Sequence, residues 1–494
     1  MGRTGATNIS RELFRHLGRA KLDSILLLIA NAIRGMFHRN EPVMTIPVTR
    51  FQGLLHQEGK ITVTAWNLSD LAYLAIRESS DFQTWEPSVH DLMGLCNFFL
   101  AWDEDRSSAE FEGLTGDNWT LKFAVGFSQK QFWYQQLYRI REEFNRQVEL
   151  LEVIPSEIGS RIDLSGVCEA VSGFDLRTLR TILFGLFSIA GKQSDLTQLT
   201  SDGTAANLHP ALTARNVHQV AALYAADYQE FRQSPLHENH FYVKPIVRTT
   251  SNHLIAVNTY MFAKKVVDGP FWIIREHYRS SGSQAFVTAF GEYFERYVEK
   301  LLQHCLAPTC FARVPAPKTG EYADWFVYTK NYRLIVELKS SLAALMIRCL
   351  YPDIEAIRTY LQKFQKGVTQ LDSTAQAYPD SGRTTIKLLV HFEALYFSDG
   401  VLRPLIVQTV KDKLMETERL YFCDIGEFEW FISLLGYSES VAESVLAAKI
   451  NMESQPGAGR EFAQVIPQIT DIGNLYMYKT LNHWDAYIPG LVQS

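Results

Sequence analysis

The stretch EYADWFVYTKNYRLIVELKSS, Glu321–Ser341, decides the fold of the second half of this chain. Its alternating apolar and polar residues predict two strands, 323–328 and 332–339, joined by a turn centred on Lys330 and Asn331. Asparagine tolerates the left-handed backbone conformation that a two-residue hairpin turn requires. The stretch therefore predicts an antiparallel β-hairpin with a defined register.

The predicted register brings three charged residues to one face at the open end of the hairpin. Asp324 lies directly across from Glu337, and Lys339 follows Glu337 by two positions, so it points to the same side. Two opposed carboxylates repel each other unless a cation lies between them. Mg²⁺ accepts one or two carboxylates together with water and phosphate oxygens, and a lysine beside it can orient or deprotonate an attacking water. The three residues predict a site for metal-dependent phosphodiester hydrolysis.

The opposite face of the hairpin is apolar, which predicts burial against a core. A surface salt-bridge cluster on an edge hairpin is the alternative interpretation of the three charged residues. The apolar residues on both faces argue against it: Trp325, Val327, Leu334, Val336 and Leu338 on one face, and Phe326 and Ile335 beside the charged cluster.

Two amphipathic helices are predicted to flank the hairpin, at Gln284–Leu302 and Tyr360–Ser373. In the first helix, Gly291 permits close approach to a sheet and Glu295 lies at the border of the apolar stripe. The second helix places several polar side chains on one face, where they can contact phosphate or water. These residues are Lys363, Lys366 and Gln370.

The order of these motifs resembles the PD-(D/E)XK, or restriction-endonuclease-like, nuclease superfamily. The shared pattern is a helix with G-x-x-F-E, a strand, a strand with Asp, a strand with Glu-x-Lys and a helix with Gln-Leu. The resemblance covers residues 281–435, and it departs from the family where Ala323 replaces the proline before the aspartate. The matching residues are Gly291, Phe294, Glu295, Asp324, Glu337, Lys339, Gln370 and Leu371.

The resemblance implies a fold class and a set of site residues. The fold class is an α/β C-terminal domain, a mixed sheet flanked by helices, joined to a mainly helical N-terminal half. Asp324, Glu337 and the backbone carbonyl of Leu338 would hold Mg²⁺, with Mn²⁺ as a substitute. Glu295 would be an additional metal ligand or water contact. Gln370 would complete the catalytic group together with Lys339, Asp324 and Glu337.

The first half of the chain carries apolar residues at helical spacing. Such stripes run through residues 22–36, 133–151 and 176–186. From Phe241 the pattern changes to two β-like runs and then a helix. We therefore predict four regions: a mainly helical recognition or regulatory region at 1–240, a β-hairpin with a connecting helix at 241–280, the nuclease-like domain at 281–440 and a C-terminal extension at 441–494.

Composition and charge favour a globular cytoplasmic protein that has no membrane span. The 494 residues are 47% hydrophobic and carry a net charge of −6, which argues against a polybasic chromatin or membrane-surface protein. The most apolar run, Ser24–Ile33, is too short to cross a bilayer. Six scattered cysteines are typical of a reducing compartment.

Together these features predict a Mg²⁺-dependent endonuclease. DNA is favoured over RNA as the substrate, and bacterial anti-phage defence is a biological context favoured by analogy alone. RNA cleavage by the same site, or a catalytically silent fold that serves in binding or assembly, are the alternatives. Residues 281–438 contain 17 Lys and Arg against 18 Asp and Glu. We therefore expect the N-terminal half, a protein partner or a second copy of the chain to supply part of the grip on nucleic acid.

Overall fold

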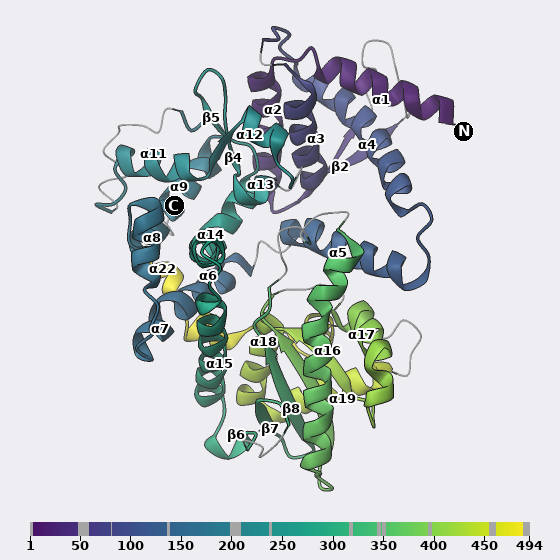
Figure 1. Cartoon of the computed structure of the whole chain (residues 1–494), viewed down its shortest axis with the longest axis vertical. Coiled ribbons are helices and arrows are strands. Elements are labelled where there is room, and N and C mark those ends of the chain that lie inside the picture. Colours follow the sequence, from purple (N-terminus) through teal and green to yellow (C-terminus); the bar gives the residue numbers. More distant parts are fainter. Residues whose placement is uncertain are drawn as a thin grey trace.

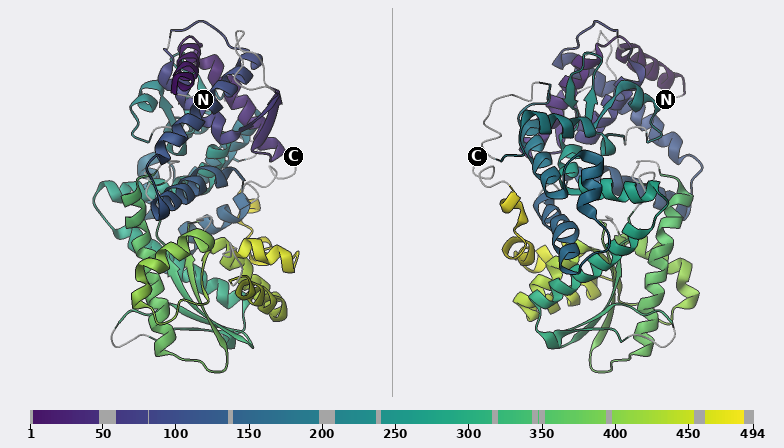
Figure 2. Two further views of the ribbon diagram at one scale, coloured as in Figure 1. Left: turned by 90° about the vertical axis from the view of Figure 1, so that its right-hand side faces the viewer. Right: turned by 60° about the vertical axis from the view of Figure 1, so that its left-hand side comes forward.

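The computed structural model describes residues 3–47, 59–80, 82–135, 139–197, 209–236, 240–315, 320–342, 347, 352–393, 398–453 and 461–487. A helical part and a sheet-containing part lie one above the other along the long axis of the molecule (Figures 1 and 2). None of the described helices is long and apolar enough to span a membrane.

The lower part is built on a five-stranded mixed sheet with the strand order β10-β9-β8-β7-β6. Strand β7 is antiparallel to both β6 and β8, whereas β8, β9 and β10 run parallel to one another. Strand β8 therefore lies at the centre of the sheet. The strands are β6 (Phe311–Arg313), β7 (Trp325–Tyr328), β8 (Tyr332–Lys339), β9 (Thr384–His391) and β10 (Leu420–Asp424).

The β7–β8 hairpin has the register that the sequence predicts. At the turn, the Thr329 N–H donates to the Tyr332 carbonyl at 2.9 Å. At the open end, the Asp324 N–H donates to the Val336 carbonyl at 3.0 Å. The pairing of the strands between these points places Asp324 opposite Glu337.

Helices cover both faces of the sheet, as predicted. The apolar residues of α15 (Ala285–Cys305) and α18 (Ile425–Tyr437) share one buried cluster with Trp325 and Val336. Those of α16 (Ile354–Ala377) and α17 (Arg403–Val410) share another with Phe326, Ile335 and Leu389. The side chains of Asp324, Glu337 and Lys339 alternate with the first group, so they belong to the α16 face of the sheet. Helix α19 (Glu439–Glu453) packs against α18.

The N-terminal half is mostly helical, which confirms the predicted fold class. Its helices are α1 (Arg3–Leu17), α2 (Leu22–Arg39), α3 (Ala65–Glu78), α4 (Val89–Phe111), α5 (Gly116–Gln135), α6 (Ile140–Val148), α7 (Ile154–Glu157), α8 (Leu164–Ser172), α9 (Leu176–Lys192), α11 (Ala214–Leu223), α12 (Tyr228–Gln233), α13 (His240–Val243) and α14 (Thr259–Ser280). A π-helical turn, Glu149–Val153, joins α6 to α7.

Two small sheets accompany these helices. Strands β1 (Val43–Pro47) and β2 (Lys60–Thr64) form an antiparallel pair. Strands β4 (Ile246–Arg248) and β5 (Leu254–Ala256) form the antiparallel pair that the sequence predicts, and β3 (Ala225–Asp227) adds a parallel third strand. The predicted 241–280 region thus shares its sheet with residues that precede it.

The last two described helices return to the N-terminal half. Helix α20 (Phe462–Ile469) packs against α18 and α19, whereas α21 (Leu475–Lys479) and α22 (His483–Tyr487) contact α6. The Arg141 guanidinium of α6 donates to the Asp485 carboxylate at 2.8 Å, and the Asn145 amide donates to the Leu481 carbonyl. Helix α6 is thereby held by residues near the C-terminal end of the described chain.

Candidate active site

The candidate site lies at the open end of the β7–β8 hairpin, on the α16 face of the sheet. The Asp324 carboxylate accepts a hydrogen bond from the Leu338 N–H at 2.8 Å, which fixes its position beside β8. The N–H and C=O of one strand residue point the same way. The Leu338 carbonyl therefore lies on the same side of β8 as the Leu338 N–H, which is the side that faces Asp324. Asp324, Glu337 and this carbonyl are therefore directed towards one region.

Lys339 is fixed beside the two acids by a chain of hydrogen bonds. Its ammonium group donates to a Glu337 carboxylate oxygen and, at 2.8 Å, to the Gln370 side-chain oxygen. The Gln370 amide nitrogen in turn donates to the Tyr322 carbonyl at 3.2 Å. The structure thus brings together four predicted site residues: Asp324, Glu337, Lys339 and Gln370.

Glu337 is buried with an incomplete set of partners. Its side chain belongs to the central strand and the residue is only 2% exposed, which excludes the surface salt-bridge interpretation on an edge hairpin. One carboxylate oxygen binds Lys339, whereas the other, Oε2, accepts no hydrogen bond from a donor among the described residues, so a proton shared with the Asp324 carboxyl is the contact left to it. A buried polar atom left in this way costs free energy unless a ligand or ion completes its contacts.

Burial and mutual repulsion raise the pKa values of both carboxyl groups. Burial raises the pKa of Asp324 to about 6; the Leu338 N–H opposes the shift and the charge of Glu295 adds to it. Burial raises the pKa of Glu337 to about 8, with Asp324 adding to the shift and Lys339 opposing it. Without a further cation, the pair therefore retains at least one proton near neutral pH.

The donor set fits a hard divalent cation. Two carboxylates and one backbone carbonyl supply oxygen ligands and leave positions for water and phosphate oxygens, which is the mixture that Mg²⁺ prefers. Within the described ranges, no group of three His, Cys, Asp or Glu side chains converges on a metal position. Any metal at this site would therefore depend on the carbonyl, on water and on substrate for its remaining ligands.

Glu295 lies apart from this group. Its carboxylate pairs with the guanidinium of Arg313 in β6, and that guanidinium also lies 4.4 Å from the centre of the Trp325 ring. Glu295 is close enough to raise the pKa of Asp324. Its direct bonding partner, however, is Arg313, a cation on the edge strand β6.

Close packing of a helix on the sheet depends on Gly367 and not on Gly291, the glycine for which the sequence predicts it. A Cβ atom at Gly291 would meet only the Ser340 hydroxyl, at an ordinary 3.6 Å, so the helix makes no close approach there. A Cβ atom at Gly367 in α16 would lie 2.8 Å from Lys339 Cε and 3.3 Å from Glu337 Cγ. Gly367 therefore lets α16 pack directly on the site. In the sequence, a glycine inside a strongly periodic helix is the pattern that indicates such close packing.

The remaining lysines of the predicted polar face lie outside the hydrogen-bonded group. Lys366 forms a solvent-exposed ion pair with Glu321 at 2.8 Å. Partial burial lowers the pKa of Lys363, and the nearby charge of Arg275 in α14 lowers it further. Lys363 thus lies one helical turn from Gly367, beside a second cation from the N-terminal half.

The chain matches no family model, and comparison with curated proteins and with solved structures finds no significant relative.

Proposed function

We propose that this chain is a divalent-metal-dependent nuclease that hydrolyses phosphodiester bonds, with DNA as the favoured substrate. The observation that supports the proposal most directly is the buried Glu337 carboxylate, which lies opposite Asp324, is bonded to Lys339 and has one oxygen that no donor of the described residues reaches. Opposed buried acids destabilise a core, whereas they supply the ligands of a site that binds Mg²⁺ or Mn²⁺.

The roles of the residues follow from their positions. Asp324, Glu337 and the Leu338 carbonyl would hold the metal, which when bound supplies Lewis-acid activation of the phosphate and of a water molecule. Lys339 would orient the attacking water and offset the negative charge that develops on the phosphate. Gln370 keeps the Lys339 ammonium in place by accepting its second hydrogen bond. Glu295 would contribute through its charge, because its carboxylate is held by Arg313.

We also propose that the helical half recognises substrate or a partner, and that the protein acts in the cytoplasm. The five cysteines that the structure describes are free thiols, which agrees with a reducing compartment. An anti-phage defence role remains a hypothesis drawn from analogy.

A cleavage panel tests the nuclease proposal. Purified protein is incubated with linear, circular and single-stranded DNA and with RNA, each in Mg²⁺, Mn²⁺ or EDTA. We expect cleavage of DNA that requires the metal and is lost in Glu337→Ala. Cleavage restricted to RNA would show that RNA, and not DNA, is the substrate. Absence of metal-dependent cleavage of every nucleic acid in the panel would favour a catalytically silent binding module.

A further inference from the structure

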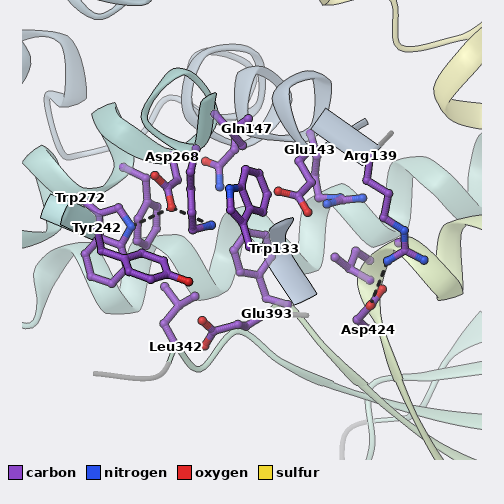
Figure 3. A pocket seen from close by; sticks show the side chains of 17 residues that line it. Trp133, Arg139, Glu143, Gln147, Tyr242, Asp268, Trp272, Leu342, Glu393 and Asp424 are labelled. Atoms are coloured by element: carbon purple, nitrogen blue, oxygen red, sulfur yellow. Dashed lines mark hydrogen bonds and ion pairs between the residues drawn. The ribbon is translucent and has the colours of Figure 1, made fainter. Parts of the chain in front are cut away.

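A cavity of about 110 Å³ lies where the helical half meets the sheet-containing domain. Helices α6 and α14 contribute one side of it, and the segments that follow β8, β9 and β10 contribute the other (Figure 3). Leu342 lines the cavity three residues beyond Lys339, and the N–H of the lining residue Phe392 donates to the Lys339 carbonyl at 2.9 Å. The cavity therefore adjoins the candidate active site.

Two polar side chains of α6, Glu143 and Gln147, point into this cavity, and Gln147 does so with an incomplete set of hydrogen bonds. Arg139, Glu143 and Gln147 follow one another at four-residue spacing, so they form one stripe of the helix. Gln147 is only 6% exposed, and its Oε1 has no hydrogen-bond partner within the described part of the chain. Burial raises the pKa of Glu143, an effect that the charge of Lys264 opposes. Figure 3 shows both side chains directed towards the open space.

The three cationic side chains that line the cavity each face an acid. Lys264 pairs with Asp268 at 3.1 Å and Arg139 with Asp424 at 3.3 Å. Arg146 is held by Glu429 at 2.6 Å. A phosphate group would therefore have to compete with existing ion pairs, whereas the Glu143 carboxyl and the Gln147 amide offer contacts to a ligand that donates hydrogen bonds.

The walls and the size of the cavity restrict the ligand further. Aromatic side chains line it on several sides, and they are Trp133, Tyr242, Phe271 and Trp272. Since one water occupies about 30 Å³ of liquid volume, the cavity has room for a few waters or one small ring system. A planar heterocycle that bears an amino group matches these contacts.

We propose that this cavity binds an amino-bearing nucleobase, with its exocyclic amino group donating to Glu143 and its donor–acceptor edge paired with the Gln147 amide. Carboxylates accept from the amino group of cytosine, and the glutamine amide matches the edge of adenine. Aromatic walls favour unstacked bases, because stacking on a side chain replaces stacking on a neighbouring base. The proposal rests on the nuclease function where the base belongs to the substrate. The same chemistry would also admit a free nucleoside.

Titration of nucleosides in EDTA tests the cavity independently of cleavage. Adenosine, cytidine, guanosine and thymidine are added to the full chain, and binding is followed by calorimetry and tryptophan fluorescence. We expect at least one amino-bearing nucleoside to bind about ten-fold or more tightly than thymidine. Glu143→Gln and Gln147→Leu should each weaken this binding by a similar factor. Glu169→Gln, the same chemical change on the exposed surface of α8, should leave it unchanged.

A variant on the opposite wall of the cavity tests nucleoside binding without altering α6. Leu342→Phe enlarges a side chain on the sheet-containing domain and should also remove nucleoside binding. Absence of binding by all four nucleosides, or binding that the three cavity variants leave intact, would overturn the proposal. Lys339→Ala should lose cleavage and keep nucleoside binding, so failure of the nuclease proposal is distinguishable from failure of this one.

Oligonucleotides distinguish the two sources of the base. If the cavity holds a substrate base, replacing the amino-bearing bases near the cut by thymine should raise KM in the wild type but not in Gln147→Leu. If it holds a free nucleoside, adding that nucleoside should change the cleavage rate of every oligonucleotide alike. Either result supports the proposal that the cavity binds a base. Cleavage that neither the thymine replacement nor the added nucleoside affects would contradict it.

Discussion

Two glutamates of equal depth, Glu429 in α18 and Glu337 in β8, show how differently this protein treats a buried charge. Glu429 is fully buried, and Arg146 donates to both of its oxygens, at 2.6 and 2.8 Å. The Tyr297 hydroxyl adds a third bond at 2.7 Å. Glu337 has one bonded oxygen and one without a partner among the described residues.

We propose that the difference separates a structural acid, Glu429, from a functional one, Glu337. The contacts of Glu429 come from α6, from α15 and from the Asn474 amide, so its charge is compensated and it joins the two halves of the molecule. The contacts of Glu337 are incomplete, and the result is a raised pKa and a carboxylate available to a cation. Under the proposed function, completeness of hydrogen bonding, rather than depth, distinguishes the acid that takes part in chemistry from the acid that stabilises the fold.

The largest expected effect is on stability at the structural acid. Glu429→Ala leaves the buried Arg146 guanidinium without its counter-ion and should lower the free energy of unfolding by about 3–5 kcal/mol. Denaturation by urea measures it, with the exposed Glu418→Ala as a control that should change little. Glu337→Ala should not lose stability in the same way; an equal loss in both variants would break the comparison.

The next effect is on catalysis and separates Lys339 from the metal ligands. Lys339→Ala should reduce cleavage on the order of 10²–10³-fold, because one preorganised donor at the phosphate is lost. Mg²⁺ should still bind, since both carboxylates remain, whereas Glu337→Ala should weaken metal binding itself. Calorimetric titration of Mg²⁺ beside a cleavage assay measures both, with the turn variant Lys330→Ala as the control. Retained cleavage in Lys339→Ala would contradict the assigned role.

A smaller effect is expected from the helix that covers the site. Gly367→Ala puts a methyl group 2.8 Å from Lys339 Cε, and such overpacking should cost about 1–3 kcal/mol and displace the lysine. The matched change Gly291→Ala meets no close neighbour and should be neutral or stabilising by up to about 1 kcal/mol, because alanine favours a helix. Thermal unfolding and cleavage assays on both variants test this; equal tolerance at the two positions would show that α16 does not pack on the site as described.

The smallest effect is a dependence of stability on pH. The pKa of Glu337 is raised from 4.5 to about 8 on folding, so the metal-free folded state keeps a proton that the unfolded state releases. Stability should therefore fall as pH rises through this range, by at most about 1.4 kcal/mol per pH unit for each retained proton. Denaturation midpoints in EDTA measure this slope. Glu337→Gln should flatten it, and an unchanged slope would mean that Glu337 is ionised without metal.

Much of the site followed from local rules of the sequence. The Lys330-Asn331 turn and the alternation of the strands determined which residues face each other, so Asp324, Glu337 and Lys339 were predictable. Helical spacing placed Gln370 near them. The partner of Glu295 was not predictable, because Arg313 reaches it from an edge strand whose position depends on tertiary packing. The Arg146–Glu429 pair joins residues 283 positions apart, a separation that no local pattern reports.

The return of the C-terminal helices to α6 has a consequence for how the protein is made. Arg141 donates a hydrogen bond to Asn482, a residue that the ribosome adds 341 positions later. Until then, α6 lacks the acids and carbonyls that hold its polar side chains. We therefore expect the nascent helical half to mature only after the sheet-containing domain and the C-terminal helices have emerged. A chain terminated before residue 424 would leave Arg139 and Arg146 without Asp424 and Glu429, a state that exposes the chain to cellular proteases.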